Sequence, residues 1–314
     1  MMCRAIDKVS PVSGGPQPLR GWPARLAKRR SFLAALPGLL SACALSGCGW
    51  IDTRQRAAVY RPDRRVPPTF RGLSAGDESF SVLSGSGVER GVLVMWWLPN
   101  ADPNAPAILY LHGTFRNLYH NHPKMEALRT AGFSVLAVEY RGWGDSAAIL
   151  PSEASIYEDT DLAWNELCRR QPRASRRVIF GHSMGTGAAT YLADRLNQQA
   201  SAQAALLVAE SSFTRLIDVA RSASAWGYPL AWFATQEFDS MTRIARVKIP
   251  VLFLHGALDR TVPIELGRRL FDAVQSPKEF VEFPEGTHSE LHTEDSARYQ
   301  RALRSWSQKL RILG

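Results

Sequence analysis

The sequence predicts an α/β fold built on a doubly wound, mostly parallel β-sheet. Short apolar, β-branched runs alternate with longer segments of helical periodicity, which is the element order of such a fold. The runs are continuously apolar rather than alternating, which indicates strands buried on both faces. Because such sheets bind ligands beyond the carboxyl ends of their strands, we expect functional residues directly after these runs.

Each predicted strand is an apolar run followed by a turn or by polar residues. The first, GVLVMWWL, is followed by the turn-forming residues PNADP. Strands are predicted at Gly91–Leu98, Ala107–Leu111, Ser134–Val138, Val178–Phe180, Ala205–Ala209, Val251–His255 and Phe280–Phe283. Helices are predicted between and after them, near Lys124–Thr130, Ile156–Arg169, Met184–Asn197, Pro263–Val274 and Ser296–Arg311.

The chain is basic, but its charge is unevenly distributed. Its 314 residues include 38 Lys and Arg against 29 Asp and Glu, a formal charge of +9. Residues 1–47 hold seven of these bases and one acid, whereas residues 71–314 carry 26 charges of each sign. The charge therefore gives no reason to expect a nucleic-acid partner. With 45% hydrophobic and 21% charged residues, the composition fits one globular domain over residues 72–314 and excludes disorder, collagen and coiled coil for the whole.

Residues 1–47 have the pattern of a signal peptide. A basic cluster, Lys28–Arg30, precedes an uncharged apolar stretch, Phe32–Ala44, that is too short to span a bilayer. The stretch leads into the letters LSGC, which resemble a bacterial lipoprotein box, and this resemblance implies lipidation of Cys48. An ordinary secretory signal is the alternative. Arg29–Leu33 resembles a twin-arginine signal, and both export routes stay open.

The cysteines leave no disulfide to expect within the domain. Cys3 and Cys43 would leave with the leader, Cys48 would carry lipid, and Cys168 would remain as a free thiol. Residues 48–71, rich in Arg and Pro, are predicted to be a solvated tether between lipid and domain. We therefore expect a lipid-anchored protein of the cell envelope that faces the periplasm, with the outer membrane preferred.

A serine nucleophile is predicted at the end of the Val178–Phe180 strand. There the pentapeptide GHSMG, residues 181–185, precedes small residues that open a helix. In a nucleophile elbow the serine occupies a strained turn, and the flanking glycines let strand and helix approach closely. Ser183 is therefore the candidate nucleophile. His182 is expected to point away from the reacting groups and to pack beside the site.

The partners of this nucleophile follow two later strands. A serine hydroxyl needs an imidazole to remove its proton, and the imidazole needs an acid to fix its tautomer. Asp259 lies in the turn after the Val251–His255 strand, and His288 lies in the loop after the last strand. The order Ser183, Asp259, His288 predicts a catalytic triad. His292 as the base and Glu210 as the acid remain alternatives.

An oxyanion hole is expected from the backbone N–H groups of Thr114 and Met184, which follow a strand end and the nucleophile respectively. His112 is expected to brace the loop that carries Thr114. No cofactor is expected, because no Gly-rich phosphate loop follows a strand. No metal is expected either: the segment His120–His122 is interpreted as loop surface, and Asp145 as a turn former.

These residues resemble the α/β-hydrolase superfamily and, within it, the small-lid serine hydrolases that include acyl-protein thioesterases. The resemblance lies in LYLHGT, GFSVLAVEYRGWGDS, VIFGHSMGTGAA, LVAESSF, PVLFLHGALDRTVP and FPEGTH. It implies the α/β-hydrolase fold with a small lid. It also implies Ser183 as nucleophile, His288 as base, Asp259 as acid, and Thr114 and Met184 as oxyanion donors. Many relatives have Asn and a small residue where this chain has Thr114 and Phe115. Because of this departure, the resemblance does not predict the shape of the acyl pocket.

The predicted activity is hydrolysis of carboxylic esters or thioesters through an acyl-serine intermediate, on a small-molecule or lipid-like acyl substrate. A lid is expected at about residues 213–245, where aromatic side chains would favour an apolar acyl group. The alternative is that these aromatics pack a helix onto the sheet. They are Phe213, Trp226, Tyr228, Trp232, Phe233 and Phe238. Two other functions stay open: a peptidase or amidase of the same fold, and a non-enzymatic envelope lipoprotein on a hydrolase scaffold.

Overall fold

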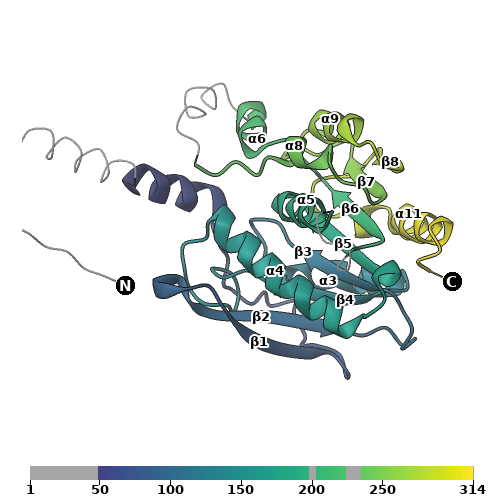
Figure 1. The fold of residues 1–314 in the computed structure, drawn as a ribbon, viewed down its shortest axis with the longest axis horizontal. Helices are drawn as coiled ribbons and strands as arrows, with labels where there is room; N and C mark the ends of the chain where they lie inside the picture. Colours follow the sequence, from purple (N-terminus) through teal and green to yellow (C-terminus); the bar gives the residue numbers. More distant parts are fainter. Residues whose placement is uncertain (1–48, 198–202, 224–234, 314) are drawn as a thin grey trace, which may run out of the picture. The chain divides into compact units, whose positions relative to one another are not determined.

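The computed structural model describes residues 49–197, 203–223 and 235–313 (Figure 1). The predicted signal peptide, residues 1–47, and the predicted lipidation site, Cys48, lie outside them. From Trp50 onward the chain forms one compact unit. None of the helices in the described part of the chain has both the length and the apolar content needed to cross a bilayer.

Eight strands form one sheet in the order β1-β2-β4-β3-β5-β6-β7-β8. They are β1 (Glu78–Ser84), β2 (Gly91–Leu98), β3 (Ala107–Leu111), β4 (Ser134–Glu139), β5 (Arg177–His182), β6 (Leu206–Glu210), β7 (Val251–Gly256) and β8 (Lys278–Phe283). β2 pairs antiparallel with β1 and with β4, and all other pairs are parallel. Every residue of the five strands from β3 to β7 is buried, which explains why their sequences lack alternation.

Helices cover both faces of this sheet (Figure 1). One face carries α4 (Glu153–Arg170), α5 (Met184–Leu196), α8 (Ser240–Ile244) and α9 (Ile264–Ala273), which share a core with Leu109. The other face carries α3 (Leu118–Thr130) and α11 (Ser296–Lys309), which share a second core with Ile108. Neighbouring residues of a strand enter opposite cores because side chains alternate along it. The prediction of a doubly wound, mostly parallel sheet is confirmed.

Two short helices lie between these elements, α6 (Leu216–Ala223) and α10 (Leu291–Glu294). The sequence predicts neither of them, and it also misses β1. β1 is an edge strand with most of its residues exposed or half-buried, so it lacks the continuous apolar run by which the other strands are recognised.

Residues 49–60 form a helix where the sequence predicts a solvated tether. Tyr60 is completely buried in the core of the α4 face, and its hydroxyl donates to Gln236 Oε1 at 2.6 Å. Arg56 Nε donates to the Pro151 carbonyl at 2.8 Å. The prediction of a solvated tether is therefore wrong for residues 49–60. The reason is that two apolar side chains at the end of this segment, Val59 and Tyr60, pack against the core of the domain.

Helix α3 begins at Leu118, six residues earlier than predicted. Pro123 lies inside α3, although a proline is disfavoured in a helix interior. Asn117 caps the helix, because its side chain accepts from the His120 N–H at 3.2 Å. The interpretation of His120 and His122 as loop residues is therefore wrong: both lie on α3.

Candidate active site

Ser183 lies in a tight turn between β5 and α5. Its φ of 53° and ψ of −123° lie in a region that residues other than glycine rarely adopt. The Ser183 N–H donates to the Glu210 carbonyl at 2.9 Å, and the Thr186 N–H donates to the Ser183 carbonyl at 2.8 Å. The surrounding backbone thus holds the strained turn of a nucleophile elbow, which exposes the serine hydroxyl at the end of the sheet.

The two glycines of the GHSMG pentapeptide are required by close backbone contacts. A Cβ atom on Gly181 would lie 2.5 Å from the Gly185 carbonyl oxygen. A Cβ atom on Gly185 would lie 2.0 Å from the Leu111 carbonyl oxygen. Backbone atoms cannot move aside as the end of a flexible side chain can. The glycines therefore let β5, α5 and the end of β3 meet beneath the serine.

The structure brings Ser183, His288 and Asp259 into a hydrogen-bonded chain. His288 Nε2 lies 2.9 Å from Ser183 Oγ, and His288 Nδ1 lies 2.8 Å from Asp259 Oδ2. When Nδ1–H donates to the carboxylate, Nε2 is left with a lone pair that can accept the serine proton. This arrangement can turn a serine hydroxyl into a nucleophile.

The surroundings of Asp259 hold it as a carboxylate. Burial acts to raise its pKa, but hydrogen bonds from His255 and His288 and from the Val262 N–H outweigh burial and lower the pKa far below its usual value. Asp259 Oδ1 accepts from the N–H groups of Thr261 and Val262 at 2.9 and 2.8 Å. Asp259 is therefore ionised at neutral pH, and its carboxylate is fixed in position.

Two side chains hold the backbone of His288. Ser211 Oγ donates to the His288 carbonyl at 3.0 Å, and His182 Nε2 lies 3.1 Å from the same oxygen. Burial and the positive charge of Lys124 keep the pKa of His182 well below its usual value, so its ring is neutral. His182 packs beside the site, as the sequence predicts. The expectation that it points away from the reacting groups is wrong, because its ring lies 5.2 Å from the His288 ring and lines the pocket of Ser183. Ser211 was missed, although its place directly after β6 in LVAESSF is the signal that could have found it.

The side chains of His292 and Glu210, the alternative base and acid, contact groups other than the Ser183 hydroxyl. The His292 ring, in α10, contacts the ring of Tyr299 at a centroid distance of 6.2 Å. The Glu210 carboxylate is completely buried, and it accepts from the Tyr299 hydroxyl at 2.9 Å and from the Lys124 ammonium group. His288 and Asp259 are thus the two side chains that are linked to Ser183 by hydrogen bonds.

Thr114 borders the pocket in front of Ser183, and Met184 directly follows the serine in the chain. Met184 is the first residue of α5, so its N–H has no acceptor within the helix. Thr114 follows β3 and lines the same pocket as Ser183. Its carbonyl accepts from the Trp143 indole N–H at 2.7 Å, which fixes the loop. An oxyanion hole made by the N–H groups of Thr114 and Met184 stays a prediction.

Buried polar contacts support the loop of Thr114. His112 Nε2 lies 3.2 Å from Glu139 Oε1, so the buried ring braces the loop as expected. Further along the loop, Asn117 Nδ2 donates to the carbonyls of Asp63 and Arg65 at 3.2 and 2.8 Å. Residues of the predicted tether are therefore part of the support of the candidate site.

A pocket of about 630 Å³ opens in front of Ser183 and His288. Two exposed apolar side chains, Phe115 and Leu258, line it. These side chains give the pocket an apolar surface that water covers in the free protein. An acyl chain could cover it in a complex.

Two arginines line the same pocket. Arg116 pairs with Glu290 at 2.5 Å. Arg260 is exposed, and no carboxylate of the described residues lies within 4 Å of its guanidinium. The pocket therefore combines an apolar surface with one uncompensated positive charge.

The described residues of the predicted lid, 213–223 and 235–245, do not line this pocket. Phe213 and Phe238 are buried in the core of the α4 face. The alternative, that the aromatics of this interval pack onto the domain, is correct for these two. Four other aromatics of the interval lie outside the described residues: Trp226, Tyr228, Trp232 and Phe233.

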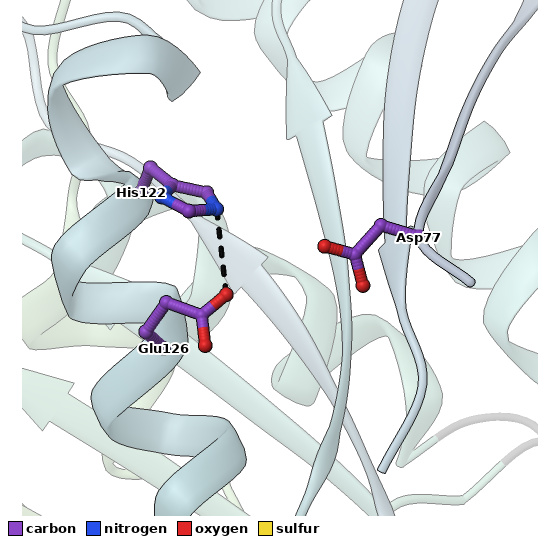
Figure 2. A group of neighbouring side chains, drawn as sticks. All are labelled: Asp77, His122 and Glu126. Atoms are coloured by element: carbon purple, nitrogen blue, oxygen red, sulfur yellow. Dashed lines mark ion pairs between the residues drawn. The ribbon is translucent and has the colours of Figure 1, made fainter. Parts of the chain in front are cut away.

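A possible metal-ligand group lies apart from the serine, at Asp77 and at His122 and Glu126 of α3 (Figure 2). Their ligand atoms all lie within 4.8 Å of one another, and His122 Nε2 is 3.3 Å from Glu126 Oε1. Arg129 pairs with both carboxylates at 2.5 Å. Because this guanidinium already compensates the two negative charges, we interpret the group as an ion-pair network.

The arrangement of strands and helices matches solved hydrolases. The esterase Pf2001 of Pyrococcus furiosus superposes with a TM-score of 0.62 over 79% of this chain and 97% of that chain, at 17% identity. An α/β-hydrolase of Vibrio vulnificus superposes with a TM-score of 0.64 over 83% of this chain and 93% of that chain, at 18% identity. The chain has the α/β-hydrolase fold. Residues 102–238, which are less than half of the chain, match the family described as "Serine aminopeptidase, S33".

This chain is similar in sequence to lipases. It is 32% identical over 197 residues to the lysophosphatidylserine lipase ABHD12 of Danio rerio, and 32% identical over 208 residues to that of Rattus norvegicus. These alignments cover 58% and 60% of this chain and 51% and 50% of the lipases, so the chain spans about half the length of these relatives. An uncharacterized protein of Mycobacterium tuberculosis is 29% identical over 267 residues, which are 84% of this chain and 91% of that protein.

Proposed function

We propose that this chain, which has the α/β-hydrolase fold, is a serine hydrolase that cleaves carboxylic esters or thioesters of an amphiphilic acyl substrate. The observation that carries the proposal is the hydrogen-bonded chain from Ser183 through His288 to Asp259 at the mouth of a pocket. The esterase fold and the lipase relatives support it.

In the first half of the reaction, Ser183 Oγ attacks the acyl carbonyl carbon while His288 Nε2 takes its proton. The N–H groups of Thr114 and Met184 stabilise the negative oxygen of the tetrahedral intermediate, a contribution of about 3 kcal/mol per donor in comparable sites. His288 then gives its proton to the leaving alcohol or thiol, the bond to that group breaks, and acyl-Ser183 remains.

In the second half, water replaces the leaving group. His288 Nε2 removes a proton from the water as its oxygen attacks the acyl carbon. When the second intermediate collapses, the proton returns to Ser183 Oγ and the carboxylic acid is released. Asp259 stays ionised throughout: it fixes the His288 tautomer and stabilises the transient imidazolium.

The lining of the pocket suits a substrate with an acyl chain and a negative charge. Phe115 and Leu258 offer apolar surface, and Arg260 offers the unpaired guanidinium. Lysophosphatidylserine, the lipid in the name of two relatives, combines an acyl ester with anionic groups. Anionic lysophospholipids are therefore the substrate class that we propose.

A peptidase activity is the second candidate, because residues 102–238 match a family described as a serine aminopeptidase. A panel of acyl esters, acyl thioesters and aminoacyl anilides separates the two. We expect turnover of the esters, its loss by a factor of about 10³ or more in Ser183→Ala, and labelling of the unchanged protein but not the variant by a fluorophosphonate. Absence of both turnover and labelling would favour a non-enzymatic lipoprotein. Turnover of the anilides alone would favour the peptidase.

We also propose that the leader directs the protein to the cell envelope, with lipid on Cys48 and the domain facing the periplasm. The support is the sequence pattern of residues 28–48. Cys48→Ser followed by membrane fractionation tests it. A variant that remains wholly in the membrane fraction would contradict the lipid anchor.

A further inference from the structure

An apolar groove of about 450 Å³ lies between the helix of residues 49–60 and α6. The helix contributes Trp50, Ile51 and Val59, and α6 contributes Leu216, Ile217 and Ala220. The Trp50 side chain is 62% exposed, which is unusual for a large aromatic residue. None of these residues lines the pocket of Ser183, so the proposed reaction does not account for the groove.

A third element adds to this apolar surface. Val88, in the turn between β1 and β2, has a fully exposed side chain. The turn lies beside the helix of residues 49–60, because Arg56 pairs with Glu89 Oε1 at 3.4 Å. Figure 1 shows the helix of residues 49–60, in purple, at the end of the domain away from α11. We call the surface made by Trp50, Ile51, Val88 and the α6 side of the groove the docking face.

The docking face is bordered by uncompensated positive charge. Arg54, Arg61 and Arg90 are exposed, and none has a carboxylate within 4 Å among the described residues. The acids that lie near them are already engaged, since Arg56 pairs with Asp52 at 3.3 Å and with Glu89. Exposed tryptophan and aliphatic side chains ringed by arginines are the chemistry that binds an anionic lipid surface.

We propose that this face docks the domain on an anionic lipid surface. Its place in the chain supports a lipid rather than a protein partner. Trp50 lies two residues after Cys48, so a lipid anchor at that cysteine would hold the face at the bilayer. The face is also joined to the candidate site. Tyr60, at the end of its helix, packs on Trp143 at a ring distance of 6.2 Å, and the Trp143 indole donates to the Thr114 carbonyl.

Vesicle sedimentation tests the proposal without the leader. Residues 50–314 form one compact unit with their own cores, so this part serves as the soluble test protein. We expect it to sediment with vesicles of phosphatidylcholine that contain one-third phosphatidylglycerol, and much less with phosphatidylcholine alone. Replacing Trp50, Ile51 and Val88 together by Ser should weaken binding at least about tenfold. Replacing Arg54, Arg61 and Arg90 by Gln should remove the preference for phosphatidylglycerol.

Leu83→Ser is the matched control. Leu83 is 59% exposed. Side chains alternate along β1, so Leu83 lies on the face opposite to Val82, which packs against the core that contains Tyr60. Replacement of Leu83 should therefore leave binding unchanged. The proposal is overturned if residues 50–314 stay in the supernatant with both vesicles, or if Leu83→Ser weakens binding as much as the triple serine variant. The groove would then hold another segment of the chain or a protein. Sedimentation needs no turnover, so it remains informative if the proposed hydrolase activity fails.

Discussion

The Ser211 hydroxyl donates to the backbone carbonyl of His288 at 3.0 Å. Ser211 directly follows β6 and has a φ of 51°, whereas His288 lies in the loop after β8. The bond therefore links two strand ends that β7 separates. It holds the backbone of the proposed base, whose ring contacts Ser183 and Asp259.

We expect Ser211→Ala to lower kcat about tenfold and to change KM less. The reason is that one neutral hydrogen bond is worth about 1 kcal/mol, and that this bond positions His288 without touching substrate. Steady-state kinetics on an activated ester measure both constants. Ser212→Ala is the matched control, because Ser212 is equally buried and its Oγ has no hydrogen-bond partner in the structure. Equal losses in the two variants would contradict a positioning role for Ser211.

We expect Asp259→Asn to lower kcat/KM by a factor of about 10³ to 10⁴. The amide carries no charge to stabilise the imidazolium, and it favours the wrong tautomer of His288. Asp145→Asn is the control: Asp145 is exposed in the turn after β4, where it accepts from the Tyr119 hydroxyl. Steady-state kinetics of the two variants measure kcat/KM, which should fall in Asp259→Asn and not in Asp145→Asn. A small effect of Asp259→Asn would return Glu210 as the candidate acid.

The sheet, and the placement of Ser183, Asp259 and His288 after its strands, could be predicted because the sequence patterns that mark them are local. A buried parallel strand is a run of apolar residues, and each of these three side chains follows such a run within a few positions. The glycines beside Ser183 carry their own local signal, because the close contacts at Gly181 and Gly185 exclude any Cβ atom.

The contacts that support the site could not be predicted in this way, because they join distant parts of the chain. The Asn117 side chain reaches the carbonyl of Asp63, and the Tyr60 hydroxyl reaches Gln236. Such pairs leave no periodicity in the sequence. Charged residues are also expected at the surface, so nothing in the sequence marks Lys124 and Glu210 as a buried pair.

We expect Arg260→Gln to raise KM up to about fivefold for an anionic acyl ester and to leave a neutral ester of the same chain length unchanged. Arg260 is the pocket arginine without a carboxylate partner among the described residues, so its charge is free to meet the substrate. A loss of up to about 1 kcal/mol corresponds to a single exposed charge pair. Arg301→Gln, at an exposed position of α11, is the control. Equal effects on both esters would contradict charge recognition by Arg260.

The last prediction concerns His292 and the stability of the fold in acid. Burial of its ring and the positive charge of Lys124 lower the pKa of His292 from 6.5 to about 4. In the unfolded chain the imidazole has its ordinary pKa, so between these two values the unfolded state binds a proton that the folded state does not. The free energy of unfolding should therefore fall as the pH drops from 6.5 towards 4, by up to about 3 kcal/mol from this residue.

Urea unfolding at a series of pH values measures this dependence, and His292→Gln isolates the contribution of one ring. The variant lacks the titrating group, so the stability difference between the two proteins should shift in favour of the variant as the pH drops. His182 shifts in the same direction but is present in both proteins, so its contribution cancels. Parallel stability curves between pH 6.5 and 4 would mean that His292 is protonated equally in the folded and unfolded chains, which its burial beside Lys124 argues against.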